Sequence, residues 1–528
     1  MQLFLTFAAY TFFVAVYSWY KLKKEKLTSK EGYFLGGRSL TGMVIAGSML
    51  LTNISTEHLI GMNGSSYKNG FIIIAWEVTS ALALILTAVY FIPKYLKMGL
   101  TTIPQFLENR FDGFTRSLVA FFLMISFVVT LLPIVLYTGA INLESIFNIS
   151  ELLHLPKSQA MIYTIWAIGL IGSLYAIFGG LKAVAVSDTL NGYGLLIGGL
   201  AVPFLALANI GEGNAIDGLS KVYQNAPDKF NVIGDKDSVM PFEVLFTGLI
   251  INQIYFWCMN QMIIQRALGA KNLEEAQKGL LFTGLLKLLV PLIIILPGVI
   301  GFYYFGDIFY DNQDMIYPEL IKKVLPNSFI GIFAAIVMGA VLSTFNSVLN
   351  SAATIFSIDI FKRHINPNIN DSHLVKTGKI TSAFLAIFAI CVAPMVGNAP
   401  DGLYQLLQQL NGIFFIPVAS IILAGFFLPK ISALAAKVAL LTGLAFYITC
   451  TFIFNVNLHF VHVWGIEFIL NMIVMILISY NFPDDKEFKI KDLQIVEMNG
   501  WKHTKVFSSF LLFMTLLIYI LLGNFNNY

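Results

Sequence analysis

Long apolar runs separated by short polar loops make up nearly all of this 528-residue chain. A transmembrane helix needs about 20 consecutive residues that are predominantly apolar. The pattern therefore predicts an all-α polytopic membrane protein with fourteen helices. Their expected ranges are 1–20, 43–66, 70–96, 115–147, 158–179, 183–211, 241–266, 279–306, 327–362, 376–396, 403–427, 432–453, 458–481 and 506–524. The longest loop between them, 212–240, is too short to fold as a separate soluble domain.

The composition agrees with this class of protein. Hydrophobic residues make up 57% of the chain and charged residues 12%, with a mean hydropathy of +0.76. Soluble domains carry about 25% charged residues. The formal net charge of +3 is too small to indicate nucleic-acid binding. The chain has no HExxH, GxSxG or Walker motif, so we expect a protein that is not an enzyme.

The cysteines add no further chemistry. Cys258, Cys391 and Cys450 all fall in apolar segments. We expect them to be small core residues, because neither a disulfide framework nor a metal-binding spacing is present.

The distribution of Lys and Arg predicts the orientation. Loop 21–38 contains six of them, and the other basic loops are 94–116, 266–278, 362–379 and 486–505. All of these loops fall on one side in the fourteen-helix count. The positive-inside rule makes that side cytoplasmic, so we expect a multi-pass protein of the plasma (inner) membrane with both termini extracytoplasmic. The first apolar run has no basic n-region and no small-residue cleavage site, which favours a retained helix over a signal peptide.

Two ionisable residues lie deep inside apolar runs. Glu77 lies in FIIIAWEVTSALALIL and Lys287 in LLFTGLLKLLVPLIIILPG. A charge near the bilayer centre costs several kcal/mol unless it faces a polar cavity or a partner. The two residues therefore predict a water-lined path or a polar binding site. A buried structural ion pair is the alternative.

Two helices carry patterns typical of interruption. The segment IAGSMLLTNISTEHLIGMNG places Asn53, Glu57 and His58 among apolar residues and then adds Gly61 and Gly64. The segment LIINQIYFWCMNQMIIQR is similar and begins about 200 residues later. Unwound backbone is tolerated at membrane depth where it lines a cavity. Broken helices at corresponding positions of two halves are typical of inverted-repeat transporters.

A series of motifs resembles one family. These are YFLGGRSL, NISTEHLIGM, AWEVTS, YAIFGGLKAVAVSDTLN, YFWCMNQMIIQRALGAKNLEEAQKG followed by LLKLLVP, LSTFNSVLNSAATIFSIDIFK and YQLLQQLNG. In this order and spacing the chain resembles the solute:sodium symporter family, and within it the sodium/glucose (galactose) cotransporter branch. The resemblance covers about residues 30 to 430. The last hundred residues match only as apolar helices.

The resemblance implies a fold and a function. The fold is a single transmembrane domain over 1–528 with two inverted five-helix repeats and broken helices, as in amino-acid/sodium symporters. The repeats are expected at 43–211 and 241–427, with peripheral helices in 1–42 and 428–528. The implied function is Na⁺-coupled uptake of a neutral, glucose- or galactose-like hexose by alternating access.

The resemblance also implies particular site residues. The solute-binding positions are Asn53, His58, Glu77, Ser80, Gln253, Lys287 and Gln408. The aromatic gate or stacking positions are Trp76, Tyr255, Phe256, Trp257 and Tyr404. The sodium ligands are the carbonyls of Leu51, Ile54 and Ala340 and the hydroxyls of Ser343 and Thr344.

The chemistry of the solute-binding residues fits a sugar. A pyranose presents hydroxyl groups on its rim and C–H groups on its faces, so its site needs donors and acceptors around an aromatic surface. Carboxylates accept, ammonium groups donate, and amides do both. For each aromatic residue, core packing or a membrane-interface belt is the alternative. For His58 the alternative is an ordinary satisfied polar group.

The sodium positions can also be argued from chemistry. Na⁺ is a hard cation that prefers oxygen ligands. Ala340, Ser343, Thr344 and Ser347 share one side of a helix through their i, i+3, i+4 and i+7 spacing. Hydroxyls on transmembrane helices also often bond the carbonyl four residues back, which is the alternative here.

Asp188 leaves the ion stoichiometry open. In some members of the family an aspartate at this position helps to form a second sodium site, here with Thr344 and Ser347. Alternatively, Asp188 only orients Ser343 and its neighbours. The sequence is therefore compatible with one or two Na⁺ per solute.

Three positions depart from the family pattern. Bacterial sugar symporters of this branch carry glutamine where this chain has His58, and asparagine where it has Gln253. Tyrosine is usual where this chain has Phe256. These differences leave the identity of the sugar open. The rival functions are a sodium symporter for myo-inositol, sialic acid or an amino acid, and a non-transporting sensor or channel of the same fold.

Overall fold

The computed structural model describes residues 2–22, 28–398, 403–454, 456–484 and 488–524. In these residues all the longer elements are helical, and β-pairing is limited to two isolated bridges, Leu40 with Ala270 and Asn272 with Glu497. The predicted all-α class is confirmed. Residue 1 of the expected first helix and parts of the basic loops 21–38 and 486–505 lie outside the described residues.

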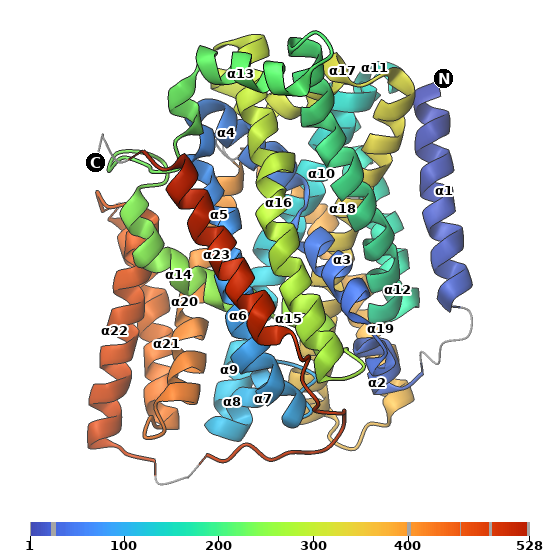
Figure 1. Cartoon of the computed structure of the whole chain (residues 1–528). Helices are drawn as coiled ribbons and strands as arrows, with labels where there is room; N and C mark the ends of the chain where they lie inside the picture. Colours follow the sequence, from blue (N-terminus) through green and yellow to red (C-terminus); the bar gives the residue numbers. More distant parts are fainter. Residues whose placement is uncertain (1, 23–27, 399–402, 455, 485–487, 525–528) are drawn as a thin grey trace.

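The α-helices follow one another around a central bundle (Figure 1). They are α1 (Gln2–Leu22), α2 (Lys30–Phe34), α3 (Gly42–Asn53), α4 (Asn63–Asn69), α5 (Ala75–Val78), α6 (Ser80–Leu86), α7 (Ile92–Lys97), α8 (Pro104–Arg110), α9 (Gly113–Ile125), α10 (Leu132–Phe147), α11 (Ile149–Leu153), α12 (Lys157–Ile210), α13 (Ala215–Asn225), α14 (Gly248–Ile254), α15 (Gln261–Leu268), α16 (Leu273–Phe305), α17 (Ile316–Val324), α18 (Asn327–Ile355), α19 (Asp371–Val392), α20 (Leu403–Phe427), α21 (Ala433–Ile448), α22 (Phe460–Asn481) and α23 (Thr504–Leu522). Short 3₁₀ or π turns join or extend many of them, at Gly36–Arg38, Glu57–Met62, Gly70–Ile74, Thr87–Phe91, Ser126–Leu131, Pro227–Phe230, Phe242–Phe246, Tyr255–Met259, Tyr310–Met315, Phe356–Ile365, Ala393–Asn398 and Thr449–Ile453.

Ten helical runs in the described residues are long and apolar enough to cross a membrane. They are Glu57–Lys97, Gly113–Phe147, Lys157–Ile210, Leu273–Phe305, Asn327–Ile365, Asp371–Gly397, Tyr404–Phe427, Ala433–Ile453, Phe460–Asn481 and Thr504–Leu522. Shorter apolar helices occupy Gln2–Ser18, Gly42–Asn53 and Gly248–Met259. Some runs contain more than one of the expected helices, so the number of fourteen crossings stays a prediction.

The longest run, α12, contains a sharp turn at Gly180. Its backbone there has φ +59° and ψ −168°, which is not helical. Both ends of α12 contact short helices, α11 and α13, that lie on the upper side of Figure 1. A Cβ atom on Gly180 would lie 2.7 Å from the carbonyl oxygen of Tyr33, in α2 on the lower side. The chain therefore crosses, turns at Gly180 and returns, as the separate expected helices 158–179 and 183–211 require.

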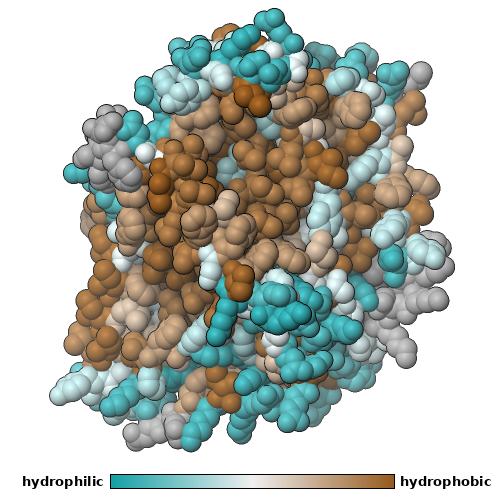
Figure 2. Space-filling model, viewed as in Figure 1, coloured by the Kyte–Doolittle hydropathy of each residue, from teal (hydrophilic) through white to brown (hydrophobic). Residues whose placement is uncertain are grey.

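The surface has the layering of a membrane protein. Figure 2 shows a hydrophobic band across the middle of the molecule, between hydrophilic upper and lower ends. Exposed side chains on α23 such as Val506, Leu516 and Ile520 belong to the apolar surface. A soluble protein rarely exposes so large an apolar area, and lipid can cover it. Helix α1 begins and α23 ends toward the same upper side (Figure 1).

Both predicted helix interruptions are present. Helix α3 ends at Asn53, Ile54 is extended with φ −83° and ψ 97°, and a π turn over Glu57–Met62 leads into α4. The second interruption separates α14 and a π turn from α15 at Asn260, whose φ is −68° and ψ 120°. Helix α3 packs against α12, α15, α16 and α18, so the first interruption lies at the centre of the bundle.

The cysteine prediction holds only in part. Cys258 is buried, but Cys391 is exposed. Cys391 lies on α19, on the same face as the exposed side chains of Phe384 and Ile387. The expectation that Cys391 is a core residue is wrong, because an apolar segment of a membrane protein can face lipid as well as the core.

We expect Gly180→Ala to destabilise the protein by about 1–3 kcal/mol, because the backbone conformation at this position is essentially restricted to glycine. The added Cβ atom would also meet Tyr33. Thermal unfolding of the detergent-purified protein measures the effect. Gly198→Ala in the same helix is the matched control, since its backbone is helical and its Cβ atom meets only side chains, the Phe333 ring at 3.3 Å and Ile336 at 3.6 Å. Equal melting temperatures for the two variants would contradict the prediction.

Candidate functional site

A cavity of about 50 Å³ lies beside the first helix interruption. Ten of the twelve predicted solute and gate residues line it, namely Asn53, His58, Trp76, Glu77, Gln253, Phe256, Trp257, Lys287, Tyr404 and Gln408. Pockets that hold small ligands usually measure about 300–1,000 Å³. The cavity has room for water but not for a sugar, so the predicted solute-binding residues lie close together in this conformation.

Lys287 and Glu77 form a direct ion pair in the wall of this cavity. The Lys287 ammonium also donates to Asn53 Oδ1 at 2.6 Å. Both charged side chains are only 1% exposed. The pair thus joins α16 to α5 and to the last residue of α3. Features of both alternatives, a polar binding site and a buried structural ion pair, are present. The pair is buried as a structural pair would be, and it lines the cavity as a binding site requires.

His58 lies between two carboxylates. Its Nε2 atom is 3.8 Å from Glu77 Oε1, and its Nδ1 atom is 3.6 Å from Glu57 Oε1. Both carboxylates and the histidine are buried. The imidazole therefore continues the polar row that starts at Lys287 and runs along the interrupted helix.

Gln253 connects the second broken helix to α5. Its amide nitrogen donates to the carbonyl oxygen of Trp76 at 2.8 Å and to Thr79 Oγ1 at 3.1 Å. Its amide oxygen accepts from Trp257 Nε1 at 3.1 Å. These bonds hold Gln253 and the Trp257 indole in fixed positions, and the amide oxygen keeps one free lone pair for a ligand.

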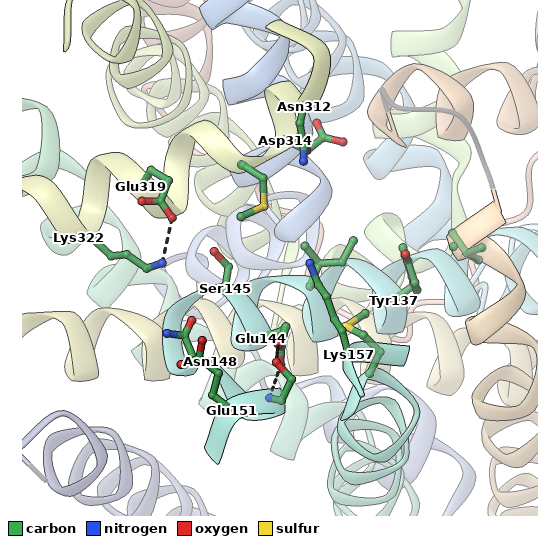
Figure 3. Close-up of a pocket in the computed structure, with 16 residues that line it drawn as sticks. Tyr137, Glu144, Ser145, Asn148, Glu151, Lys157, Asn312, Asp314, Glu319 and Lys322 are labelled. Carbon is green, nitrogen blue, oxygen red and sulfur yellow. Dashed lines mark hydrogen bonds and ion pairs between the residues drawn. The ribbon is translucent and has the colours of Figure 1, made fainter. Parts of the chain in front are cut away.

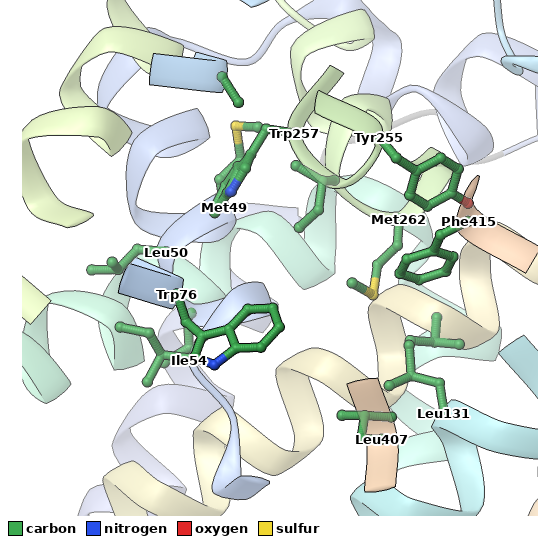
Figure 4. Close-up of a cluster of buried hydrophobic side chains, with 14 of the residues drawn as sticks. Met49, Leu50, Ile54, Trp76, Leu131, Tyr255, Trp257, Met262, Leu407 and Phe415 are labelled. Carbon is green, nitrogen blue, oxygen red and sulfur yellow. The ribbon is translucent and has the colours of Figure 1, made fainter. Parts of the chain in front are cut away.

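Aromatic rings enclose the polar row on two sides. Tyr404 lies edge-on to His58 and to Trp76, with ring centroids 5.2 and 5.8 Å apart, and its hydroxyl accepts from Gln408 at 2.8 Å. On the other side Tyr255 stacks on Phe415 at 4.2 Å. Figure 4 shows this stacked pair across from Trp76 and Trp257, with apolar side chains between them.

Two predicted residues do not line the cavity. The Ser80 hydroxyl, at the start of α6, donates to the backbone carbonyl of Glu77 in the preceding α5. Tyr255 is fully buried in its stack on Phe415. In this conformation neither residue presents a polar group to the cavity, and their contacts with a solute stay predictions.

The sequence reasoning missed other polar residues of the wall. Glu57, Thr52, Asn252 and Asn411 also line the cavity. The Oδ1 atom of Asn411 is buried and has no hydrogen-bond partner within the described residues. The spacing of three residues between Gln408 and Asn411 on α20 could have identified it, since such residues share a helix face.

The predicted sodium ligands also come together. Ala340, Ser343 and Thr344 lie on α18 and are buried, and α18 packs against α3. The Thr344 hydroxyl donates to the carbonyl oxygen of Thr52 at 3.0 Å. It therefore bonds across to the interrupted helix, and not to the carbonyl four residues back. The Ser343 hydroxyl is buried beside the Asp188 carboxylate and can donate a hydrogen bond to it.

Asp188 lies in a second polar cluster beside these residues. It accepts from Ser48 Oγ at 2.8 Å and pairs with Arg266 Nη2 at 3.5 Å. From the sequence, Arg266 is expected to be the first cation of the basic cytoplasmic loop 266–278. The structure shows that this assignment is wrong: Arg266 is fully buried, because α15 turns its side chain into the bundle toward α3, α12 and α18.

A larger cavity of about 480 Å³ lies nearer the upper side, among α10, α11, the start of α12 and α17 (Figure 3). Its wall mixes acidic and basic side chains, including the ion pair of Glu319 with Lys322 at 2.9 Å. The Glu144 carboxylate lies apart from that ion pair and accepts hydrogen bonds from the backbone N–H and the hydroxyl of Ser150. None of the predicted solute or sodium residues lines this cavity.

Comparison with known proteins identifies the family. The family described as "Sodium:solute symporter family" matches residues 33–443. The chain belongs to the sodium:solute symporter family. This is a family of transporters, so the protein is a multi-pass membrane protein, and the resemblance found in the sequence is confirmed.

Several curated relatives are similar over most of the chain. An uncharacterized symporter of Escherichia coli K12, YidK, is 44% identical over 99% of this chain and 91% of its own length. The sodium/glucose cotransporter of Vibrio parahaemolyticus is 34% identical over 80% of both chains. A human sodium/myo-inositol cotransporter is 30% identical over 80% of this chain and 62% of its own length.

A solved structure confirms the fold. The substrate-bound, outward-open state of a Na⁺-coupled sialic acid symporter matches 92% of this chain and 99% of its own, with a TM-score of 0.79 and 21% identity. The family itself supports sodium as the coupling ion. The division into repeats at 43–211 and 241–427 stays a prediction.

We expect Lys287→Met or Glu77→Gln alone to lower stability by about 3–5 kcal/mol, because each leaves a buried charge without its partner. The double variant should recover most of this loss. Thermal unfolding of the four proteins in detergent, without solute, measures the coupling. The matched control is Lys322→Met in the half-exposed pair with Glu319, where the loss should stay below about 1 kcal/mol. Additive losses in the double variant would contradict the prediction.

Proposed function

We propose that this protein is a Na⁺-coupled symporter that takes up a neutral sugar by alternating access. One observation carries the proposal: neighbouring residues at the first helix interruption serve the two candidate sites. The Thr52 carbonyl accepts from Thr344 in the proposed sodium site, and Asn53 accepts from Lys287 in the proposed solute site. An ion bound at one site therefore acts on the backbone that positions the other.

The proposed coupling follows from these contacts. Na⁺ bound by the carbonyls of Leu51, Ile54 and Ala340 and the hydroxyls of Ser343 and Thr344 would tie the interruption to α18. A ligand shifts a conformational equilibrium only by its differential affinity for the two states. We propose that Na⁺ favours the outward-open state, in which Asn53 and His58 are arranged for the solute. Release of Na⁺ to the cytoplasm then weakens the hold on the solute.

The solute class follows from the charges in the wall. Glu77 and Glu57 flank His58, and Lys287 is the cationic member of the row. Carboxylates in the wall disfavour an anionic solute and suit hydroxyl groups, which donate to them. Trp76, Trp257 and Tyr404 supply apolar faces for the C–H groups of a pyranose. The relatives named for glucose and myo-inositol carry neutral polyhydroxy solutes by their names, which supports a neutral sugar or polyol.

The driving force is sufficient for this task. One charge that moves through 100 mV releases about 2.3 kcal/mol. A tenfold sodium gradient adds about 1.4 kcal/mol. Their sum, about 3.7 kcal/mol, concentrates a neutral solute by a few hundred-fold for each ion. No carboxylate belongs to the proposed sodium ligands, so the charge of the bound ion remains to sense the membrane potential.

We place the protein in the plasma (inner) membrane, with the basic loops in the cytoplasm and both termini outside. The positive-inside rule supports this orientation. The position of α1's start and α23's end toward the same side of the bundle agrees with it (Figure 1).

Ser343→Ala together with Thr344→Ala should abolish Na⁺-driven uptake, because backbone carbonyls alone cannot replace the two hydroxyl ligands. The protein should still reach the membrane. Uptake of radiolabelled glucose or galactose into proteoliposomes with an imposed Na⁺ gradient is the measurement. Thr164→Ala is the matched control, since this buried hydroxyl bonds only the carbonyl of Ala160 in its own helix. Unchanged sodium dependence in the double variant would remove these residues from the ion site.

A solute panel tests the substrate class. Glucose, galactose and myo-inositol should compete for Na⁺-driven uptake, whereas sialic acid and amino acids should not. Competition by sialic acid alone would assign the site to an anion and refute the role given to Glu77. Binding of a sugar without counterflow in proteoliposomes would favour the non-transporting sensor instead.

A further inference from the structure

Arg266 is the largest charged side chain that is fully buried among the described residues. It belongs to α15, the helix that follows the second interruption, and it points into the centre of the bundle. A buried guanidinium is stable only when its charge is paired and its N–H groups are bonded. The groups that bond to the guanidinium therefore indicate which cation this position accommodates.

All three parts of the guanidinium have partners. Nε donates to Ser48 Oγ at 2.8 Å, and Nη1 donates to the backbone carbonyl of Met262. Nη2 donates to Ser347 Oγ and lies 3.5 Å from the Asp188 carboxylate. Ser48 in turn donates to the same carboxylate oxygen at 2.8 Å. The cluster thus joins α15 to α3, α12 and α18.

Two of these partners are the residues predicted for a second sodium ion, Asp188 and Ser347. We propose that Arg266 is a tethered cation that fills this position, so that the protein binds one Na⁺ per transport cycle. This inference rests on the proposed function, because it assigns the stoichiometry of the same coupled uptake.

Electrostatics supports the exclusion of a second ion. The cluster contains one carboxylate, and Arg266 already neutralises it. Na⁺ at the same place would put two cations beside one anion in a medium where charges interact strongly. It would also have to remove the guanidinium from Ser347 and Asp188, which would leave that charge buried without a partner.

The first ion position keeps its ligands despite this arrangement. The Ser343 hydroxyl can donate a hydrogen bond to Asp188, and a hydroxyl that donates keeps its oxygen lone pairs for an ion. Thr344 contacts Thr52 and not the guanidinium. Arg266 therefore occupies one side of α18 and leaves the side at Ser343 and Thr344 available to Na⁺.

The test counts bound ions without any solute. Equilibrium binding of ²²Na⁺ to the purified protein should give one ion per chain for the wild type. Arg266→Gln removes the charge but keeps hydrogen-bonding groups near Ser347, and it should bind two ions. Arg266→Lys keeps the charge and should bind one. Two ions in the wild type would overturn the proposal, as would one ion in a folded Arg266→Gln variant or two in Arg266→Lys.

Two further variants separate the possible failures. If Arg266→Gln does not yield folded protein, the comparison of the wild type with Asp188→Asn decides. If the guanidinium fills the position, both proteins bind one ion. If Asp188 binds a second ion, the wild type binds two ions and Asp188→Asn binds one. Ser343→Ala with Thr344→Ala should bind none. Absence of ²²Na⁺ binding to the wild type would instead refute the proposed sodium coupling itself, and the inference with it.

Discussion

The unwound backbone at Ile54 is the constraint on which the rest of this structure depends. In a membrane, backbone groups that leave a helix must find partners inside the protein, because lipid offers none. Thr344 donates to the Thr52 carbonyl, and the hydroxyls of Thr56 and Thr138 bond each other just beyond the interruption. Thr344, which satisfies the Thr52 carbonyl, is also one of the proposed sodium ligands. The contact that compensates for the helix break and the proposed ion site thus share this residue.

Two buried ion pairs flank this break and differ in one property. Lys287 and Glu77 line the cavity, so hydroxyl groups of a ligand can join or replace their contacts. Arg266 and Asp188 line none of the described cavities near the break, and serines saturate their remaining contacts. Under the proposed function, the first pair can exchange its contacts with those of a solute, whereas the second keeps its contacts to serine. Both pairs have the same kind of charges and the same burial, so their surroundings separate the proposed binding group from the proposed tethered counter-ion.

Much of the fold could be predicted, because hydropathy and helix breakers act locally. The polar residues near Asn53 and the motif before Asn260 indicated both interruptions correctly. Long-range packing decided the remaining features. The basic-loop rule misplaced Arg266, since composition cannot tell a residue that flanks a membrane from one that α15 turns into the bundle. Cys391 was misplaced because apolar segments face both lipid and core. The direct contact of Lys287 with Glu77 also depends on how α16 and α5 pack, which no local pattern encodes.

The small cavity is bordered by side chains from helices that could move separately. Tyr404, packed edge-on against His58 and Trp76, borders it on one side, and Phe415, on which Tyr255 stacks, borders it on the other. His58 and Tyr255 belong to the first and second broken helices, whereas Tyr404 and Phe415 both belong to α20. A movement of either broken helix relative to α20 therefore opens one side and can leave the other closed. Since the proposed sodium site ties only the first broken helix to α18, an ion there can act on one closure selectively, and alternating access requires such selectivity.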